Sequence, residues 1–297
     1  RFAKNIRALA SLVPGSYEAY KPLIDAANIQ PLVKPSGELH VFESDAAFKE
    51  AQKNFDIRRA NGVDVEVLDA DGVRQLEPGL VRSIKYGVFL PGCYQTTNPF
   101  RFVDALAQHF VANGGSFVKA SVEDLSMEAD GSAKITTDNG ILSAEKVVLA
   151  FGAFSKPFAE KFGLRVNLDS ERGYHVNLPN PGVVLNRAVI SGDHRFALAP
   201  IDEGVRVVGT AELAKVGAPP NYPRAERLVP LAKHLLPGLA DTGQTKWMGH
   251  RPSTPDSLPV IGRSETHPNV YFAFGHNHSG LTLGGMTGKL VADIVAG

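Results

Sequence analysis

The stretch "NVYFAFGHNHSGLTLGGMTGKLVADIVAG" (residues 269–297) predicts a strand, a glycine-rich loop and a helix in direct succession. Residues 269–275 are apolar and aromatic, which is typical of a strand, and an apolar stretch suited to a helix follows the glycines. At such a junction the helix directs its positive end and its free N–H groups towards a ligand. The stretch therefore indicates an α/β architecture that carries a candidate binding loop.

The loop fits three kinds of binding site unequally well. A P-loop needs a lysine directly after its second glycine, whereas Leu281 follows Gly280 here. A metal site would use His276 and His278, but no H-x-x-x-H pair or partner carboxylate pattern accompanies them, so we expect no metal. A backbone cradle needs only glycines that let the main chain approach a ligand, and the candidates are Gly275, Gly280, Gly284, Gly285 and Gly288. Tight packing between strand and helix would explain the same glycines without a ligand.

Two styles of sequence alternate along the chain and predict two domains. Segments 95–163 and 244–297 carry helices and apolar runs, among them "KVVLAFGAF" (146–154), which suits a strand buried on both faces of a parallel sheet. Segments 1–94 and 164–243 combine helices with short strands between turn signals, as in an antiparallel sheet. We expect an α/β domain interleaved with an α+β domain, and a cleft between them. In the first domain we expect a capped helix at 98–115 and a strand at 116–128.

Composition excludes several classes of function. Lys+Arg and Asp+Glu both number 31, so the chain has no net charge with which to attract a nucleic-acid backbone. The single cysteine, Cys93, cannot form an intrachain disulfide, and a cysteine-based zinc site is excluded. No apolar run approaches the roughly 18 residues that a spanning helix needs. We expect a cytoplasmic protein, either free or held peripherally at the inner face of a membrane.

Three motifs occur in order along the chain: "KVVLAFGAFSKPFAEKFG" (146–163), "GHRPSTPDSLPVIGRS" (249–264) and "FGHNHSGLTLGGMTGKLVADIV" (274–295). They resemble the strand beside the flavin, the G-x-R-P-x-T-P-D-x-x-P-x-I-G segment and the C-terminal flavin loop of one family. This is the D-amino-acid oxidase / D-amino-acid dehydrogenase family of FAD-dependent oxidoreductases, which includes glycine and sarcosine oxidases. The segments "RGYHVNLP" (172–179) and "VVGTAE" (207–212) resemble strands of its substrate domain.

The sequence departs from the family in one large feature. The family opens with a strand, a G-x-G-x-x-G loop and a helix that hold the FAD pyrophosphate, and this sequence contains no G-x-G-x-x-G. It begins at Arg1, inside a helix-like pattern. We therefore expect the chain to be a truncated portion of a longer enzyme, with an incomplete, Rossmann-like FAD-binding domain. FAD binding would then belong to the full-length protein.

The resemblance also implies residues that contact FAD. Backbone near the end of the apolar run would pass close to FAD, a strand residue would contact the adenine, and the C-terminal loop would face the pyrimidine end of the isoalloxazine. Hydrogen-bond donors at that end stabilise the negative charge that develops as a hydride reaches N5. The residues so implied are Val122, Ala150, Gly152, Ser155, Gly280, Leu281 and Thr282.

A second set of residues is implied on the substrate side. Arg251, in the G-x-R-P motif, would grip a substrate carboxylate bidentately; a surface arginine paired with Asp256 is the alternative. His278 would lie near flavin and substrate, and Tyr174 and His175 belong to a strand that lines the substrate site. A purely structural role stays open for these last three residues.

The implied reaction is the oxidation of an amino acid or secondary amine. The Cα hydride passes to flavin N5, and the imine hydrolyses to a 2-oxo acid, so positioning supplies most of the catalysis. The electron acceptor would be oxygen or a quinone. Two alternatives remain: a 2-hydroxy-acid dehydrogenase of the same superfamily, and a non-catalytic fragment or subunit that keeps the fold.

Overall fold

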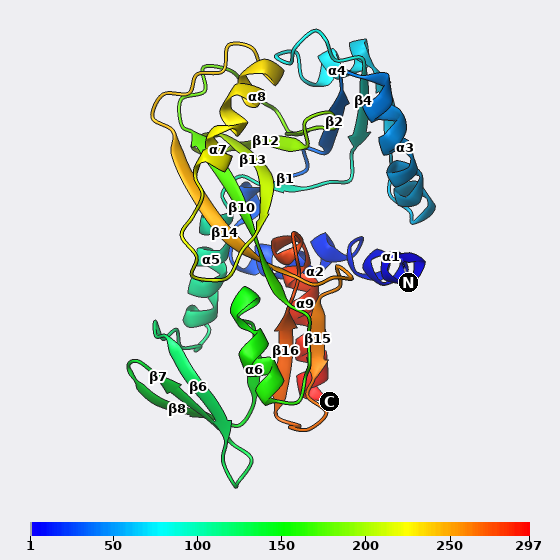
Figure 1. Cartoon of the computed structure of the whole chain (residues 1–297). Coiled ribbons are helices and arrows are strands. Elements are labelled where there is room, and N and C mark those ends of the chain that lie inside the picture. The colour runs from blue at the N-terminus through cyan, green and yellow to red at the C-terminus, as the bar shows by residue number, and fades with distance from the viewer. Residues whose placement is uncertain (1) are drawn as a thin grey trace.

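The computed structural model describes residues 2–297, and its largest element is an eight-stranded sheet (Figure 1). The strand order is β14-β10-β13-β12-β11-β2-β4-β3. All neighbours are antiparallel except β11 and β2, which run parallel. The strands are β2 (Glu38–Phe42), β3 (Glu66–Asp69), β4 (Tyr86–Leu90), β10 (Asp169–Leu178), β11 (Ala188–Ser191), β12 (Phe196–Ile201), β13 (Gly204–Leu213) and β14 (Thr245–Ser253). The antiparallel sheet predicted from the sequence is confirmed.

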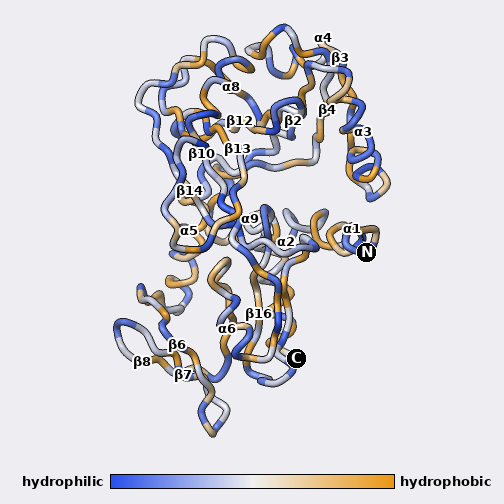
Figure 2. Tube along the Cα trace, in the orientation of Figure 1, coloured by the Kyte–Doolittle hydropathy of each residue, from blue (hydrophilic) through white to orange (hydrophobic). Residues whose placement is uncertain are grey.

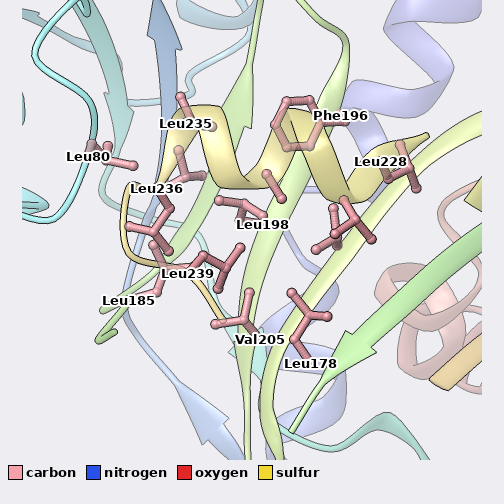
Figure 3. Packing of buried hydrophobic residues seen from close by; sticks show 14 of the residues in the cluster. Leu80, Leu178, Leu185, Phe196, Leu198, Val205, Leu228, Leu235, Leu236 and Leu239 are labelled. Carbon is pink, nitrogen blue, oxygen red and sulfur yellow. The ribbon is translucent and has the colours of Figure 1, made fainter. Parts of the chain in front are cut away.

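One face of this sheet forms the main core together with helix α8 (Leu228–Leu235) (Figure 3). Successive side chains of a strand point to opposite faces, so alternate residues of β10 are buried in the core. Each fully buried leucine contributes roughly 1.5–3 kcal/mol relative to an exposed one. The short helix α7 (Pro223–Glu226) precedes α8, while α3 (Asp45–Ala60) and α4 (Ala70–Leu76) flank the opposite end of the sheet (Figure 1).

A smaller sheet lies at the other end of the molecule and has the order β15-β16-β9. Its strands are β15 (Val260–Arg263), β16 (Val270–Phe274) and β9 (Val147–Leu149), and β16 runs parallel to β9. It is followed by α9 (Gly280–Ala296), and α6 (Lys156–Lys161) packs nearby after the 3-10 turn η2 (Gly152–Phe154). A separate hydrophobic cluster fills this region. Figure 2 accordingly shows hydrophobic residues spread over both ends of the molecule.

The remaining elements connect or extend these two parts. The predicted helix at 98–115 is α5 (Pro99–Ala112), and the side chain of its cap Asn98 accepts a hydrogen bond from the N–H of Arg101. A small antiparallel sheet projects beyond it. The others are α1 (Phe2–Leu12), α2 (Ser16–Ala26), η1 (Gln30–Leu32), β1 (Val33–Lys34), β5 (Gln95–Thr96), β6 (Val122–Met127), β7 (Ala133–Thr137) and β8 (Gly140–Ala144). None of the helices described is both long and apolar enough to cross a bilayer.

Two predicted strands are shorter in the structure than in the sequence pattern. The strand predicted at 116–128 forms only as β6, and the apolar run at 146–154 forms only the short strand β9. Within the described residues β9 has a neighbour on one edge alone, and Val148 is 39% exposed. The prediction that this strand is buried on both faces is therefore wrong here, because a strand needs a ladder partner and a covering layer.

The structure also differs from the expected domain bounds in two places. Strand β14 was expected in the α/β segment, yet it is the edge strand of the large sheet beside β10. Helix α2 was expected with the antiparallel sheet, yet it packs against α9 and α5. Strand pairing decides where β14 lies, and helix packing decides where α2 lies. Local composition reports neither.

Candidate active site

Arg251 is the centre of a polar cluster on one face of the large sheet. The antiparallel register of β10 and β14 places Arg251 opposite Glu171. Its Nη1 donates to Oε1 of Glu171 at 3.2 Å, and Oγ of Ser253 donates to Oε2 at 3.2 Å. The alternative partner Asp256 is not the one that Arg251 contacts. The side chains of Arg251 and Glu171 are 20% and 21% exposed, so this ion pair is partly shielded from solvent.

His278 reaches the same carboxylate from the C-terminal loop. Its Nε2 lies 3.3 Å from Oε1 of Glu171. Burial lowers the pKa of His278, and the charge of Arg251 lowers it further, against a smaller opposing effect of Glu171. The lowered pKa favours the neutral imidazole. The structure thus brings Arg251 and His278 together, as the sequence predicted, around a glutamate that the sequence analysis missed. Only the strand register, which places Glu171 opposite the G-x-R-P arginine, would have revealed it.

His175 lies on the same face as Glu171 and stacks on Trp247, with ring centroids 5.0 Å apart. Burial, with a smaller contribution from the charge of Arg206, lowers the pKa of His175 to about 4. The uncharged imidazole of His175 thus forms part of the protein surface beside Arg251.

Tyr174 lies on the opposite face, and its side chain is 1% exposed. Its hydroxyl donates to Oε2 of Glu212 and accepts the N–H of Asn221 at 3.0 Å. It belongs to the main hydrophobic core, so the structure does not bring it to Arg251. The expected catalytic role of Tyr174 is corrected to a structural one, because neighbouring residues of a strand face opposite ways.

The predicted flavin loop leads into the N-terminus of α9. Gly280, Leu281 and Thr282 are its first three residues and are exposed, and the preceding Ser279 makes no side-chain capping bond. Such a terminus presents backbone N–H groups without helical acceptors and a partial positive charge. These groups fit the electron-rich pyrimidine end of a flavin ring.

Asn277 holds this loop against the end of β14. Its Oδ1 accepts the N–H of Thr254 at 2.9 Å, and its Nδ2 donates to the Thr254 hydroxyl and to the carbonyl of Gly275. Its own N–H donates to the carbonyl of Pro252, and its φ of 51° lies in the left-handed region that asparagine tolerates. This role of Asn277 was not predicted from the sequence, which shows only an asparagine between two histidines.

Glycines that were predicted in the loop lie within α9 instead, and two of them serve packing rather than a cradle. A Cβ on Gly285 would lie 2.8 Å from Cγ of Tyr20, and Gly284 approaches the hydroxyl of the same tyrosine. That hydroxyl donates to the carbonyl of Leu281 at 2.7 Å. His276 is likewise structural, because its Nε2 contacts the Thr287 hydroxyl at 2.8 Å. The cradle interpretation is therefore restricted to the beginning of α9.

The other implied FAD residues surround η2. Gly152 has a φ of 57°, and a Cβ there would meet no atom within 4 Å. Ser155 is fully buried, and within the described residues its hydroxyl has no hydrogen-bond partner. Ala150 is exposed directly after β9. Val122 lines a cavity of about 1050 Å³ together with Phe151, Phe154 and Ser170. Backbone freedom, an unpartnered hydroxyl and an apolar cavity fit a large, flat cofactor on this side.

A two-part arrangement results: free helical N–H groups suited to a flavin ring, next to an arginine suited to a carboxylate. This arrangement fits a flavin-dependent oxidoreductase. The model of the FAD dependent oxidoreductase family (DAO) matches residues 2–294. The chain belongs to this family of FAD-dependent oxidoreductases.

Relatives and solved structures agree with this assignment. The D-amino-acid oxidase of Bradyrhizobium diazoefficiens strain USDA 110 is 32% identical over 301 residues, which cover 100% of this chain and 71% of the relative. The D-amino acid dehydrogenase of Agrobacterium fabrum strain C58 is 30% identical over 306 residues, covering 100% of this chain and 72% of that protein. The structure of glycine oxidase from Geobacillus kaustophilus superposes with a TM-score of 0.81 at 22% identity, covering 99% of this chain and 78% of that one. The last comparison confirms the fold.

Proposed function

We propose that the full-length enzyme oxidises a small amino acid or a related secondary amine, with Arg251 holding the substrate carboxylate. The observation that carries this proposal is the position of Arg251. Its guanidinium is partly buried, held by Glu171, and borders the loop that begins α9. A planar guanidinium binds a carboxylate through two parallel hydrogen bonds and so fixes which Cα–H faces the cofactor.

The chain's own residues supply orientation in this proposal. Glu171 is a positioning residue, because it holds both Arg251 and Ser253. The neutral His278 borders the substrate without adding charge. Bound FAD would supply the hydride acceptor N5, and the N–H groups of Gly280, Leu281 and Thr282 would face the negative charge that develops beyond it. Val122, Ala150, Gly152 and Ser155 would hold the rest of the cofactor.

In the proposed reaction the substrate loses a hydride from Cα and a proton from the amine nitrogen. The resulting imine adds water and gives a 2-oxo acid and ammonia, or a free amine from a secondary amine. Because Arg251 and the α9 terminus act by position, no general base is required. FAD, when bound, would supply the route by which the electrons reach oxygen or a quinone.

The test is anaerobic mixing of the FAD-loaded full-length protein with matched substrates. Alanine and proline in both D and L forms are compared with D- and L-lactate, and bleaching of the flavin absorbance is followed. We expect bleaching with an amino acid and formation of the matching 2-oxo acid or cyclic imine. Bleaching by lactate alone would identify a 2-hydroxy-acid dehydrogenase, and no bleaching by any carboxylated amine would favour a non-catalytic subunit. Peroxide formation in air separates oxygen from a quinone as acceptor.

A further inference from the structure

Glu43, His194 and His234 form a cluster at a different place on the large sheet. One ligand atom from each residue lies within 4.8 Å of the others. Nε2 of His234 lies 2.9 Å from Oε1 of Glu43, and Nε2 of His194 lies 3.5 Å from Oε2. Strands β13, β12 and β11 separate this end of β2 from the pair β10–β14 that carries Arg251. The cluster is therefore not part of the site described above.

We propose that this cluster binds one divalent transition-metal ion of the zinc type. Two imidazole nitrogens and one carboxylate are a ligand set that zinc accepts, with a water molecule as the fourth ligand. Ligands about 2.0–2.2 Å from a tetrahedral ion lie some 3.5 Å from each other, so small rotations of the side chains suffice. His194 and His234 are 37% and 47% exposed, which leaves a path for the ion and its water.

The three ligands come from separate parts of the chain and are individually positioned. Glu43 directly follows β2, His194 lies in the turn between β11 and β12, and His234 lies in the last turn of α8. α8 is fixed because its apolar face packs into the main core. A bound ion would therefore join a helix to two segments of the sheet beneath it.

Asp193 positions the backbone at Glu43 through hydrogen bonds. Its carboxylate accepts the backbone N–H groups of Glu43 at 2.8 Å and Ser44 at 3.2 Å. Because Asp193 directly precedes His194, one residue fixes the spacing of two ligands. Such outer partners orient the ligands of a metal site, and their loss costs about 10–100-fold in affinity.

The charge of the cluster also favours a cation. The side chain of Glu43 is 17% exposed, and in the part of the chain described its ion-pair partners are the two histidines. No described lysine or arginine forms an ion pair with it. Because a metal ligand imidazole must be neutral, the partly buried carboxylate of the metal-binding form has no full positive charge beside it, and a divalent ion would supply one.

The test is calorimetric titration of the FAD-loaded, tag-free full-length protein with ZnCl2. We expect one ion per chain and a rise in the melting temperature that EDTA reverses. Glu43→Gln, His194→Gln and His234→Gln should each weaken binding by at least about tenfold, and Asp193→Asn by about tenfold. His109→Gln, which removes a partly exposed histidine of α5 outside the cluster, is the matched control and should bind as the unaltered protein does.

Two results would overturn the proposal. If Glu43→Gln binds Zn²⁺ as tightly as the unaltered protein, the histidines act as a weak pair and no three-ligand site exists. If His109→Gln weakens binding as much as His194→Gln, the metal binds surface histidines without preference. The melting temperature of each variant without metal reports whether it folds, and the readout does not depend on amine oxidation.

Discussion

The guanidinium of Arg251 lies directly over the backbone of Gly173, on the neighbouring strand. A Cβ at residue 173 would lie 2.8 Å from Nε of Arg251 and closer still to Cζ and Nη2. The absence of a side chain at this position therefore gives Arg251 the room to reach Glu171. We expect this pair of residues to set the affinity for the substrate carboxylate.

The first prediction concerns Gly173→Ala. Its backbone does not lie in the left-handed region, so alanine is tolerated and the flexible end of Arg251 moves instead. We expect KM for carboxylated amines to rise about tenfold, equivalent to roughly 1.4 kcal/mol, with an almost unchanged melting temperature. Gly92→Ala is the control, because a Cβ there would meet open space. An unchanged KM in Gly173→Ala would show that Arg251 does not bind the substrate.

The second prediction concerns Arg251 itself. Arg251→Ala removes a charge-assisted bidentate contact worth roughly 3 kcal/mol, so KM should rise on the order of 10²-fold. Arg251→Lys should restore part of this affinity, because it keeps the charge but loses the planar fork. Steady-state kinetics and the flavin content are measured together. The exposed Arg59→Ala on α3 serves as control, and equal kinetics for the two alanine variants would refute the proposed role.

The third prediction separates structure from catalysis at Tyr174. Tyr174→Phe removes one donor from Glu212, which keeps its ion pair with Arg172, and leaves the N–H of Asn221 without this acceptor, so the free energy of unfolding should fall by about 1–3 kcal/mol. We expect kcat and KM to stay within a factor of about two, since the hydroxyl faces the core. Urea unfolding and turnover are measured on the same sample. A large loss of kcat with unchanged stability would contradict this assignment, and the half-exposed Tyr94→Phe is the control.

The fourth prediction is a pH dependence of stability that arises from His175. Its pKa falls from 6.5 to about 4 on folding, mainly through burial. The unfolded chain thus binds more protons between these values, so stability is lost as the pH falls from 6.5 towards 4 and is unaffected above that window. His175→Gln should reduce the difference in urea midpoint between pH 7.5 and pH 5. The control His109→Gln, at a partly exposed position on α5, should leave the difference unchanged, and an unchanged difference in His175→Gln would contradict the prediction.

Local patterns predicted the helices well, because capping and helical periodicity act over a few residues, but α9 begins at Gly280, within the stretch predicted as a glycine loop. Asn98 and Pro99 at the start of α5 are one example. The prediction of a strand at 116–128 is wrong for its first half, because a strand depends on a partner that local sequence does not specify. Phe117 is 73% exposed there, outside any ladder.

The residues of the candidate site were also predictable only in part. A motif pointed to Arg251 and His278, whereas Glu171 enters only through the register of β10 with β14. Tyr174 was assigned to the wrong face, since a resemblance in a strand says nothing of which neighbours point inward. The glycines at 284 and 285 were explained by Tyr20, which lies more than two hundred and fifty residues away in the chain.

Asn277 gives the loop before α9 a property that bears on cofactor affinity. Its hydrogen bonds to Pro252, Thr254 and Gly275 hold the loop through residues of the chain itself. The conformational entropy of this segment is thus lost when the chain folds. A flavin ring that meets the loop encounters a preorganised surface, so its binding free energy is not reduced by the cost of ordering those residues.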